Sequence, residues 1–326
     1  METFRYRMMG LVMLAMAGQP VLAQQAGLAA AKDYPLRPIR IVIPYGAGAG
    51  PDVVGRMFAQ KIVPSLGQNF VFENRGGAGG TIGTALVAKA PPDGYTLLLQ
   101  TANYASYPVF IKNLPYDPAD LISVSLLART VGFLVVVNPS LPVRSIKELI
   151  ALAKAHPGKL NHGTSSEGVP AELFAKMAGV KLTAVRYKGV AAFMSDVISG
   201  QIEIGFPAAP SGLPFAASGR LRVLAITGEK RWNRMPDVPT VDEAGLRGYK
   251  REGWYGLWFP LGTPAQHMNR IQEEVNKAAR DPELRQRFDE QGLIAVGSSS
   301  RELEQATREE FEVTGTLWAS LGRAPQ

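Results

Sequence analysis

The chain has 326 residues, of which 46% are hydrophobic and 19% are charged, and its formal net charge is +7. This length leaves room for two lobes, each with its own core. The absence of cysteine excludes disulfides, thiolate nucleophiles and cysteine metal sites. Lysines and arginines are scattered among acidic residues without a basic tract, so the pattern argues against nucleic-acid binding and favours encounter with anionic solutes.

Residues 1–23 are typical of an export signal. Arg5 and Arg7 precede an apolar run from Met8 to Ala17, and Val21-Leu22-Ala23 forms a cleavage site. A membrane anchor is the alternative, but polar residues interrupt the run before it reaches the ~20 apolar residues that a bilayer requires. We therefore expect the signal to be removed and the mature protein to be soluble and periplasmic.

Between Pro38 and Gln100, apolar runs alternate with helical patterns. The alternation is typical of a parallel sheet, and continuous apolar runs such as Ile41-Val42-Ile43 indicate strands that are buried on both faces. Turn residues and prolines mark the boundaries of these elements. The predicted order is a strand at Ile39–Pro44, a helix at Pro51–Val63, a strand at Asn69–Glu73, a helix at Thr81–Ala90 and a strand at Tyr95–Gln100.

A second alternating series follows and predicts another parallel sheet with its own core. Ser145 and Glu148 have the spacing of a capping box at the start of a helix. The predicted order is a strand at Phe133–Val137, a helix at Ile146–Ala155, a strand at Leu160–Gly163, a helix at Pro170–Ala178, a strand at Thr183–Arg186, a helix at Ala191–Ser199, and strands at Ile202–Phe206 and Leu221–Thr227.

After a proline-rich stretch, Trp254–Phe259 predicts a strand, and helices follow it to the C-terminal region. Their predicted starts are Thr263-Pro264, Asp281-Pro282 and the pair Ser299 and Glu302. Because these helices need a sheet to cover, we expect the tail to return to the first sheet. The expected division is a discontinuous domain I at 34–124 and 227–326, domain II at 125–226, and two crossover strands near Val124–Val137 and Leu221–Thr227.

Two glycine-rich stretches, Gly46–Asp52 and Gly76–Thr81, each follow a predicted strand and lead into a predicted helix. Backbone N–H groups at the start of a helix lack partners inside the helix and lie at the positive end of its dipole. Two such turns that face each other can hold a carboxylate or phosphate without an arginine. The chain is therefore predicted to bind a small anion. Asp52, in the first helical turn, either caps its helix or braces the facing loop.

The glycine stretches do not fit a nucleotide-binding fingerprint. Where a third glycine is required, the first stretch has Pro51 or Val53 and the second has Ile82, and neither stretch contains the G-K-[ST] of a P-loop. The three histidines are far apart in sequence and lack the i, i+4 spacing of a helical metal pair. We therefore expect no cofactor and no metal site.

A third stretch, Gly163–Gly168, places Thr164, Ser165 and Ser166 ahead of a predicted helix. Hydroxyls at such a position donate to an anion together with the backbone. The alternative is a serine nucleophile, which would make the protein an exported hydrolase or transferase acting on a carboxylic ester. That alternative lacks the G-x-S-x-G elbow, and a base at His162, so close in sequence, rarely meets triad geometry.

Charged and aromatic residues near these loops have two interpretations each. Arg75 and Lys188 either pair with a ligand anion or are solvated loop charges. Aromatic residues at predicted strand ends either wall a pocket or belong to the core, and they are Tyr45, Tyr104, Phe206 and Trp254.

Several motifs occur in a set order over nearly the whole mature chain. They are Tyr34–Val42, Glu73–Gly83, Ala88–Leu97, Tyr187–Gly189, Gly219–Ala225, Pro236–Gly245 and Gly262–Pro264. No single motif is diagnostic, but the ordered set is specific. In this set the chain resembles the Bug, or tripartite tricarboxylate transporter, family of periplasmic solute-binding proteins.

The resemblance implies an α/β type II periplasmic binding protein, whose two lobes, joined by two crossover strands, close like a Venus flytrap on a small carboxylated molecule. It also implies a monomer without catalytic residues that docks on membrane transporter subunits or a sensor kinase. Carried over to this sequence, the ligand-binding residues are Tyr45, Ala47, Gly48, Asp52, Ala78, Gly79, Thr81, Thr101, Asn103, Thr164, Ser165, Ser166, Tyr187, Phe206, Pro207 and Ala208.

The sequence departs from the family pattern at several positions. Ser166 and Glu172 stand where relatives usually have a glycine and a histidine, and Pro207 replaces an aspartate that is common in the family. Glu172 either adds negative charge near the cleft or points to solvent. These departures affect the identity of the ligand and leave the expected binding of one carboxylate unchanged.

Overall fold

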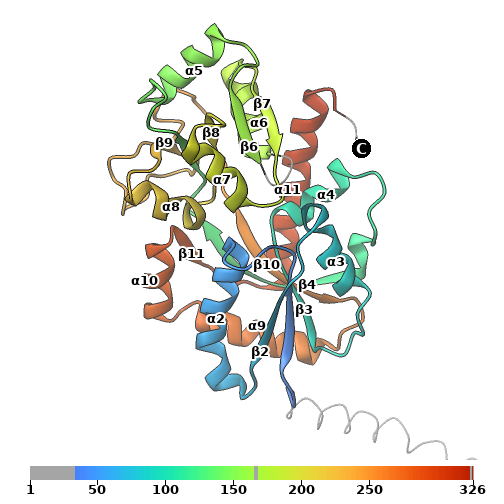
Figure 1. Cartoon of the computed structure of the whole chain (residues 1–326). Helices are drawn as coiled ribbons and strands as arrows, with labels where there is room; N and C mark the ends of the chain where they lie inside the picture. The colour runs from blue at the N-terminus through green and yellow to red at the C-terminus, as the bar shows by residue number, and fades with distance from the viewer. Residues whose placement is uncertain (1–33, 165–167, 324, 326) are drawn as a thin grey trace, which may run out of the picture.

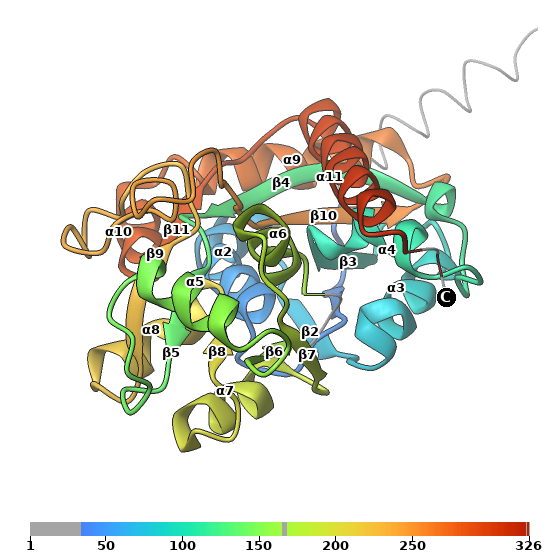
Figure 2. The same ribbon diagram turned by 90° about the horizontal axis from the view of Figure 1, so that it is seen from above.

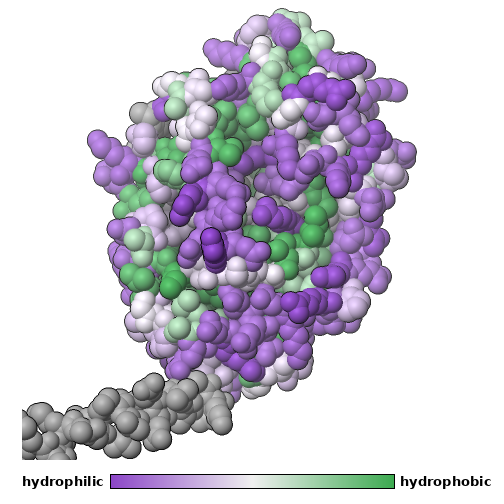
Figure 3. All heavy atoms as spheres, turned by 180° about the vertical axis from the view of Figure 1, so that it is seen from behind, coloured by the Kyte–Doolittle hydropathy of each residue, from purple (hydrophilic) through white to green (hydrophobic). Residues whose placement is uncertain are grey.

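The computed structural model describes residues 34–164, 168–323 and 325, so the expected export signal at 1–23 lies outside the described residues. The described chain forms two lobes, each built on its own sheet (Figure 1). In this part of the chain, no helix is long and apolar enough to cross a membrane. Hydrophilic side chains cover most of the face seen from behind (Figure 3).

The first lobe is built on a mixed sheet, whose strands in spatial order are β11 (Leu293–Ala295), β4 (Leu121–Thr130), β10 (Trp254–Pro260), β3 (Thr96–Thr101), β1 (Ile39–Ile43) and β2 (Phe70–Asn74). Strands β1, β2 and β3 are parallel, as predicted. Strand β10 is antiparallel to β3 and β4, and β11 is antiparallel to β4. Strands β10 and β11 therefore bring part of the tail to the first sheet, and their antiparallel pairing makes the whole sheet mixed.

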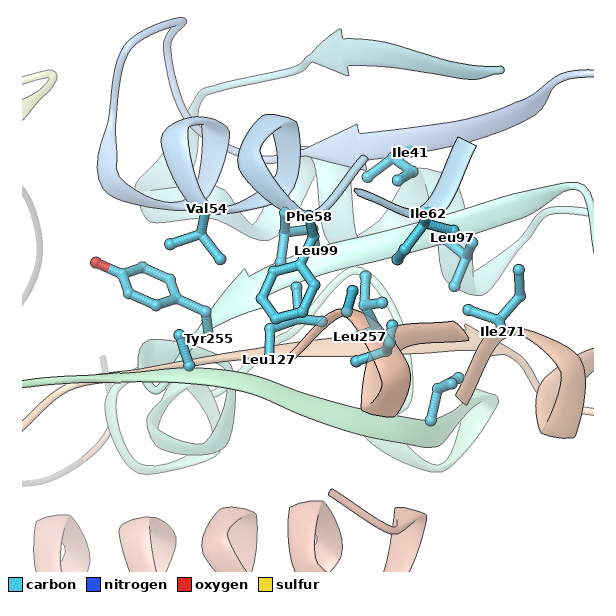
Figure 4. Packing of buried hydrophobic residues seen from close by; sticks show 14 of the residues in the cluster. Ile41, Val54, Phe58, Ile62, Leu97, Leu99, Leu127, Tyr255, Leu257 and Ile271 are labelled. Carbon is cyan, nitrogen blue, oxygen red and sulfur yellow. The ribbon is translucent and has the colours of Figure 1, made fainter. Parts of the chain in front are cut away.

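Helices cover both faces of this sheet, and they are α2 (Gly50–Leu66), α3 (Thr81–Ala88), α4 (Asn103–Phe110), α9 (Ala265–Ala278), α10 (Pro282–Glu290) and α11 (Ser300–Ser320). Two short 3-10 helices, η1 (Ala78–Gly80) and η2 (Pro118–Asp120), precede α3 and β4. The core under α2, α9 and α10 is apolar, and Phe58 and Phe288 meet edge to face with ring centroids 5.4 Å apart. Figure 4 shows Tyr255 at one end of this core, next to Val54.

The second lobe is built on a smaller sheet, whose strands in spatial order are β7 (Thr183–Arg186), β6 (Asn161–Thr164), β8 (Ile204–Gly205), β5 (Leu134–Val137) and β9 (Arg222–Ile226). Strand β6 is parallel to β7 and β8, whereas β5 is antiparallel to β8 and β9. This sheet is therefore also mixed rather than parallel. Its helices are α5 (Ile146–Ala155), α6 (Val169–Ala178), α7 (Val190–Ser199) and α8 (Ala209–Ala217).

Most predicted elements recur with small shifts at their ends, and α5 begins and ends at the predicted residues. The sequence interpretation contains no counterpart of α4, α8 or β11. Helix α4 contains Pro108 and α8 contains Pro210 and Pro214. Proline inside a helical pattern indicates a break, so the propensity rule fails at these two helices because tertiary packing outweighs it.

The predicted helix caps have mixed outcomes. Ser299 forms the full capping box of α11, as predicted. The Ser145 hydroxyl accepts the Glu148 N–H at 3.2 Å, but the Glu148 carboxylate accepts the N–H of Arg144 at 2.7 Å instead of that of Ser145. The Thr263 hydroxyl donates to a carbonyl that precedes α9, so the predicted cap by this residue is wrong.

The chain crosses between the lobes at 131–133, after β4, and returns at 251–253, before β10. Two threonine hydroxyls tie these crossings together. Thr130 Oγ1 accepts the N–H of Gly253 at 2.8 Å, and Thr227 Oγ1 accepts the N–H of Phe133 at 2.7 Å. The two crossing segments therefore lie side by side and form a single hinge region.

The stretch between β9 and the return crossing packs with the second lobe. Val241, Leu246 and Tyr249 belong to the core of the second sheet. The expected division instead placed everything after residue 226 in the first domain, because this stretch contains no strand pattern that links it to the second sheet. We propose that the second lobe extends from β5 to about residue 250.

Gly228 packs closely against the backbone of the first crossing, and this close contact can be tested. A Cβ on Gly228 would lie 2.0 Å from the carbonyl oxygen of Val131, which belongs to the backbone and cannot rotate away. Gly228→Ala should therefore lower the free energy of unfolding by about 1–3 kcal/mol, measured by chemical denaturation. Gly189→Ala is the control, because a Cβ there meets nothing within 4 Å and the backbone is extended. Equal stability of the two variants would contradict this close contact.

Candidate functional site

A cleft between the lobes contains two adjoining chambers. The aromatic chamber has a volume of about 150 Å³, and the glycine chamber has a volume of about 840 Å³. Tyr45, Ala49, Val190 and Ser211 line both chambers, so the two are continuous. The aromatic chamber is lined by these four and by Gly50–Pro51, Thr101–Asn103, Thr130, Phe133, His162–Thr164, Gly168–Ala171, Phe193, Phe206–Ala208 and Arg251–Tyr255. The glycine chamber is lined by the same four and by Pro44, Gly46–Gly48, Gly76–Gly80, Tyr187–Gly189, Ala191, Met194, Pro210, Pro214 and Phe215.

Most of the predicted ligand-binding residues line this cleft. Asp52 and Thr81 line neither chamber, and Ser165 and Ser166 lie outside the described residues. Thr81 is buried and donates its hydroxyl to the carbonyl of Ala78 at 3.0 Å. The predicted residues at the aromatic chamber are Tyr45, Thr101, Asn103, Thr164, Phe206, Pro207 and Ala208, and those at the glycine chamber are Tyr45, Ala47, Gly48, Ala78, Gly79 and Tyr187.

Helices from both lobes begin at the cleft. Residues of the first turns of α2, α4, α6, α7 and α8 line one or both chambers. Each helix start carries backbone N–H groups without partners in the helix and the positive end of the helix dipole. Helices α4 and α8 were not predicted from the sequence, so more helices begin at the cleft than we expected.

Several N–H groups of the two glycine stretches are free to bind an anion. In the described part of the chain, the backbone N–H groups of Gly46, Ala47, Gly77 and Ala78 donate to no protein atom. The N–H of Gly48, which we expected to face the ligand, is already engaged by a carboxylate of α2. The free donors come from both stretches, and these residues line the same chamber.

Left-handed backbone shapes the second glycine stretch. Gly77, Ala78, Gly79 and Gly80 have φ values of 129°, 44°, 66° and 109°. Ala78 departs from the usual preference of residues that carry a Cβ, and such conformations persist where the surroundings hold them. The Tyr107 hydroxyl donates to the carbonyl of Gly79 at 2.7 Å and fixes the turn from behind.

Asp52 holds the first stretch in place. Its carboxylate accepts hydrogen bonds from the Gly48 N–H at 2.9 Å, Arg56 Nε at 3.0 Å and Asn74 Nδ2 at 3.3 Å. Asn74 also donates to the carbonyl of Tyr45 at 3.1 Å, so one carboxylate ties α2 to the ends of β1 and β2. Burial raises the pKa of Asp52, but these hydrogen bonds outweigh burial and hold its pKa below the usual value. The contacts favour the bracing interpretation of Asp52.

A chain of polar groups lies at the end of β3. The hydroxyls of Tyr45 and Thr101 are 2.9 Å apart, and Thr101 Oγ1 also accepts the N–H of Asn103 at 3.3 Å. Gln100, which is fully buried, accepts the Thr101 N–H through its side-chain oxygen at 2.7 Å. Burial raises the pKa of Tyr45, so its hydroxyl stays protonated as a donor. Sequence reasoning missed Gln100 because nothing marks a buried amide within an apolar strand.

The walls of the aromatic chamber include residues that sequence reasoning did not assign to the site. Phe133, Phe193 and Tyr255 line it, together with Trp254 from the list of aromatic candidates. Tyr104, another candidate, belongs to the core and lines neither chamber. The sequence signal that pointed to this wall was the adjacent aromatic pair Trp254-Tyr255 at the start of a predicted strand.

Among the described residues, few charged side chains line the cleft. Lys188 lies at the glycine chamber and is exposed. Arg251 and Glu252 line the aromatic chamber, although no sequence pattern placed them there. Arg75 pairs with Glu73 and lines neither chamber, so it is not a cleft cation.

Glu172 follows neither of its two expected interpretations. Its carboxylate pairs with Arg323, just beyond α11, at 3.0 Å, and its side chain is 13% exposed. It lines neither chamber. Beside this ion pair, Leu317 and Trp318 of α11 pack against Val169 of α6, so the C-terminal helix of the first lobe contacts the second lobe (Figures 1 and 2). The Glu172 carboxylate therefore forms an ion pair between α6 and the residue that follows α11, and it points neither into the cleft nor to solvent.

His162 lies on β6 at the aromatic chamber and is 1% exposed. Its Nδ1 atom is buried and has no hydrogen-bond partner among the residues that the structure describes. Burial lowers the pKa of His162 to about 4, so the imidazole is neutral near pH 7.

The model of the tripartite tricarboxylate transporter family receptor matches residues 54–322. The chain belongs to this family. Protein BugT of Bordetella pertussis is 34% identical over 295 residues, which cover 87% of this chain and 89% of BugT. These matches confirm the family that the ordered motifs indicated, whose members are solute-binding proteins.

Solved structures of similar chains agree with this assignment. An R. palustris protein solved with adipate is 32% identical with a TM-score of 0.87, and the match covers 90% of this chain and 100% of that one. MatC from Rhodopseudomonas palustris with bound malate is 26% identical with a TM-score of 0.79, and the match covers 87% and 99%. The two lobes of this family receptor are those of a type II periplasmic binding protein.

The bracing contacts of Asp52 predict how the stability of this receptor depends on pH. Asp52→Asn should lower the free energy of unfolding by about 1–3 kcal/mol at pH 7, because charged hydrogen bonds to Gly48 and Arg56 weaken. A lowered carboxyl pKa stabilises the fold above the usual carboxyl pKa, and this contribution is lost as the pH falls through the lowered value. Denaturation curves of wild type and variant should therefore converge in acid.

The matched control for this experiment is Glu283→Gln. Glu283 also lies in the first turn of a helix and pairs with a lysine, but its side chain is 67% exposed and it lines neither chamber. An exposed pair contributes little, so this variant should keep the wild-type stability. A loss for Asp52→Asn no larger than the loss for Glu283→Gln would refute the bracing role.

His162 predicts a second pH dependence. The folded state takes up this proton near pH 4 and the unfolded state near pH 6.5, so stability falls as the pH drops between these values. The loss at the acid end amounts to about 3 kcal/mol at most. His162→Gln should flatten the stability profile in this window, whereas the control His156→Gln, at an exposed position, should not. Denaturation at a series of pH values measures both, and parallel profiles for wild type and His162→Gln would contradict the neutral buried state.

Proposed function

We propose that this chain is a periplasmic solute-binding protein that captures a small carboxylated molecule and delivers it to membrane transporter subunits or to a sensor kinase. It acts as a monomer, needs no cofactor and catalyses no reaction. The observation that carries the proposal is the set of free N–H groups at Gly46, Ala47, Gly77 and Ala78, which line one chamber of the cleft. The predicted ligand-binding residues that line the cleft remain part of this proposal, and so do Ser165 and Ser166, whereas Asp52 and Thr81 support the loops.

The chemistry of the cleft suits a carboxylate. Fixed N–H dipoles at helix starts compensate a negative charge without the desolvation cost of bringing a cation into the site. Among the relatives, one structure contains adipate and another contains malate, and both molecules are carboxylic acids. The surrounding aromatic walls then provide apolar surface for the rest of the ligand.

The arrangement of the lobes supports capture by closure. The lobes are joined through the crossings at 131–133 and 251–253, and both lobes contribute helix starts to the cleft. A ligand that contacts both lobes at once favours the closed state, because these contacts are complete only when the lobes meet. The closed form then presents the surface that a membrane partner distinguishes from the open form.

The alternative of an exported serine hydrolase depends on Ser165 or Ser166, which lie outside the described residues. No observation favours it. The family consists of solute-binding proteins.

A thermal-shift screen against small mono-, di- and tricarboxylic acids tests the proposal, with hits confirmed by calorimetry. A binding acid at 100 times its dissociation constant should stabilise the fold by about 2.7 kcal/mol. The methyl ester of each hit should bind at least about tenfold more weakly, because the esterified group carries no charge and accepts fewer hydrogen bonds from the N–H groups. Failure of the whole acid panel, or equal binding of esters, would refute carboxylate capture, and release of free acid from the esters would favour the hydrolase.

A further inference from the structure

We propose that one end of the second lobe binds the headgroups of anionic phospholipids, so that the protein collects at the surface of a membrane. We call this end the lysine pole, and it consists of Lys154, Lys159, Lys176 and Lys181. The inference goes beyond capture of the ligand. It rests on the proposed function only for the periplasmic location, where a membrane lies within reach.

The positive charge of the chain is concentrated on the second lobe. Residues 131–250, between the two crossings, contain 15 lysines and arginines and nine aspartates and glutamates, whereas residues 34–130 and 251–326 contain 17 of each class. The second lobe therefore has a formal net charge of +6, and the first lobe has none. The cations are scattered along the sequence, but the fold gathers their excess on one lobe. Such a lobe is drawn towards an anionic surface.

The cations of the second lobe differ in their partners. In the stretch that follows β9, Arg231 pairs with Glu243 and Lys250 pairs with Glu229. All four lysines of the pole are exposed, and within the described ranges their ammonium groups form neither an ion pair nor a hydrogen bond. The excess charge of the lobe is therefore accessible at the pole.

Nearby carboxylates are engaged elsewhere. The Glu203 carboxylate accepts the backbone N–H of Asn161 at 2.7 Å and its side-chain amide at 3.1 Å. The Glu148 carboxylate accepts the N–H of Arg144 at 2.7 Å. Both acids are held by backbone donors, so neither compensates a lysine of the pole through a direct contact.

The fold brings the four lysines to one end of the lobe. Lys154 lies in the last turn of α5, and Lys176 lies in the last turn of α6. Lys159 precedes β6 and Lys181 precedes β7, and these parallel strands begin side by side. The N–H of Gly158 donates to the carbonyl of Lys181 at 2.9 Å, and a Cβ on Gly158 would lie 3.4 Å from Cδ of Lys181. The Lys181 side chain therefore extends over the loop that carries Lys159.

This end of the lobe is remote from the ligand cleft. Strands β6 and β7 run from the far end of the second lobe towards the first lobe (Figure 1). The other end of β6, at residues 162–164, lines the aromatic chamber. No lysine of the pole lines either chamber. The pole can therefore contact a surface while the cleft stays open to solutes.

The helix dipole explains only half of this cluster. A cation in the last turn of a helix stabilises the helix, and this accounts for Lys154 and Lys176. Lys159 and Lys181 lie outside the helices, so the same reason does not apply to them. Like charges at one end of a lobe also repel each other. An anionic surface would remove this repulsion.

The composition of the pole favours a lipid surface over a protein partner. Protein interfaces have an apolar core, with aromatic residues and arginine enriched and lysine depleted. The pole consists of lysines, and Met177, at 37%, is the only large hydrophobic side chain that is exposed within the described part of 131–250. Lipid headgroups require no apolar core, because they are mobile and gather around lysines through charge alone.

Cosedimentation with lipid vesicles tests this inference. The protein used is residues 24–326, because the apolar run of the export signal would itself bind a bilayer. Vesicles of phosphatidylcholine with about 30% phosphatidylglycerol should bind this protein at least about tenfold more tightly than vesicles of phosphatidylcholine alone. The binding should weaken about tenfold between about 50 and 300 mM NaCl, because salt screens exposed charges.

A fourfold variant tests the pole itself. It combines Lys154→Gln, Lys159→Gln, Lys176→Gln and Lys181→Gln. Each lysine near an anionic surface contributes about fivefold, so this variant should lose about 100-fold or more in binding to the anionic vesicles. The four corresponding changes to arginine preserve the charge and should keep the binding within about threefold.

A matched control removes the same charge from the first lobe. It combines Lys89→Gln, Lys112→Gln, Lys277→Gln and Arg280→Gln, all at exposed positions without an ion pair among the described residues. Lys277 also lies in the last turn of its helix, so the control reproduces the loss at a helix end. This variant should bind anionic vesicles within about threefold of wild type. Melting temperatures show that each variant is folded.

The possible outcomes separate this inference from the proposed function. Equal binding of wild type to both kinds of vesicle, or equal losses in the pole variant and the control, would overturn the lipid assignment. Binding that requires reconstituted transporter subunits and is lost in the pole variant would also overturn it, because the partner would then be a protein. Calorimetry with carboxylic acids tests the proposed function separately, and the pole variant should keep the wild-type affinity for them.

Discussion

The site depends on backbone N–H groups that are kept unpaired and held in place. Helix α2 begins at Gly50 without a side-chain cap, and Asp52 instead reaches back to the N–H of Gly48. Because the carboxylate takes this donor, the loop is fixed while the donors of Gly46 and Ala47 stay free. Donors fixed in this way need no reorganisation when a ligand arrives, and they carry no net charge that water would have to leave.

Residues of both lobes line the cleft. A helix start offers only a few free N–H groups, and each glycine stretch lies at the end of a strand in the first lobe. The second lobe adds the starts of α6, α7 and α8 and the aromatic side chains Phe193 and Phe206. Hydrogen bonds of Thr130 and Thr227 join the crossings, so the two lobes are linked through one short hinge region.

Features that depend on neighbouring residues could be predicted from the sequence, whereas features that depend on residues far apart in the chain could not. The glycine stretches were found because the signal, a strand followed by glycines and a helix, is contiguous, and the same holds for the start of α11 at Ser299. Helices α4 and α8 were missed because their prolines indicate breaks that packing overrides. Arg251 was missed for a different reason. Its buried position depends on Glu310, which lies far away in sequence, and no spacing rule connects the two residues.

Helix α11 contacts the hinge region, and the residue just after it pairs with the second lobe. Glu310 of this helix holds Arg251 at the hinge, and Arg323, just after the helix, pairs with Glu172 of the second lobe. An opening motion that carries α6 away from α11 must separate that ion pair and expose Leu317, which packs beside it. Exposing apolar surface costs about 25 cal/mol per Å², so opening is opposed on this side even without a ligand. Under the proposed function, the contacts of a ligand with both lobes would add to this preference and would need only a modest free energy to select the closed form.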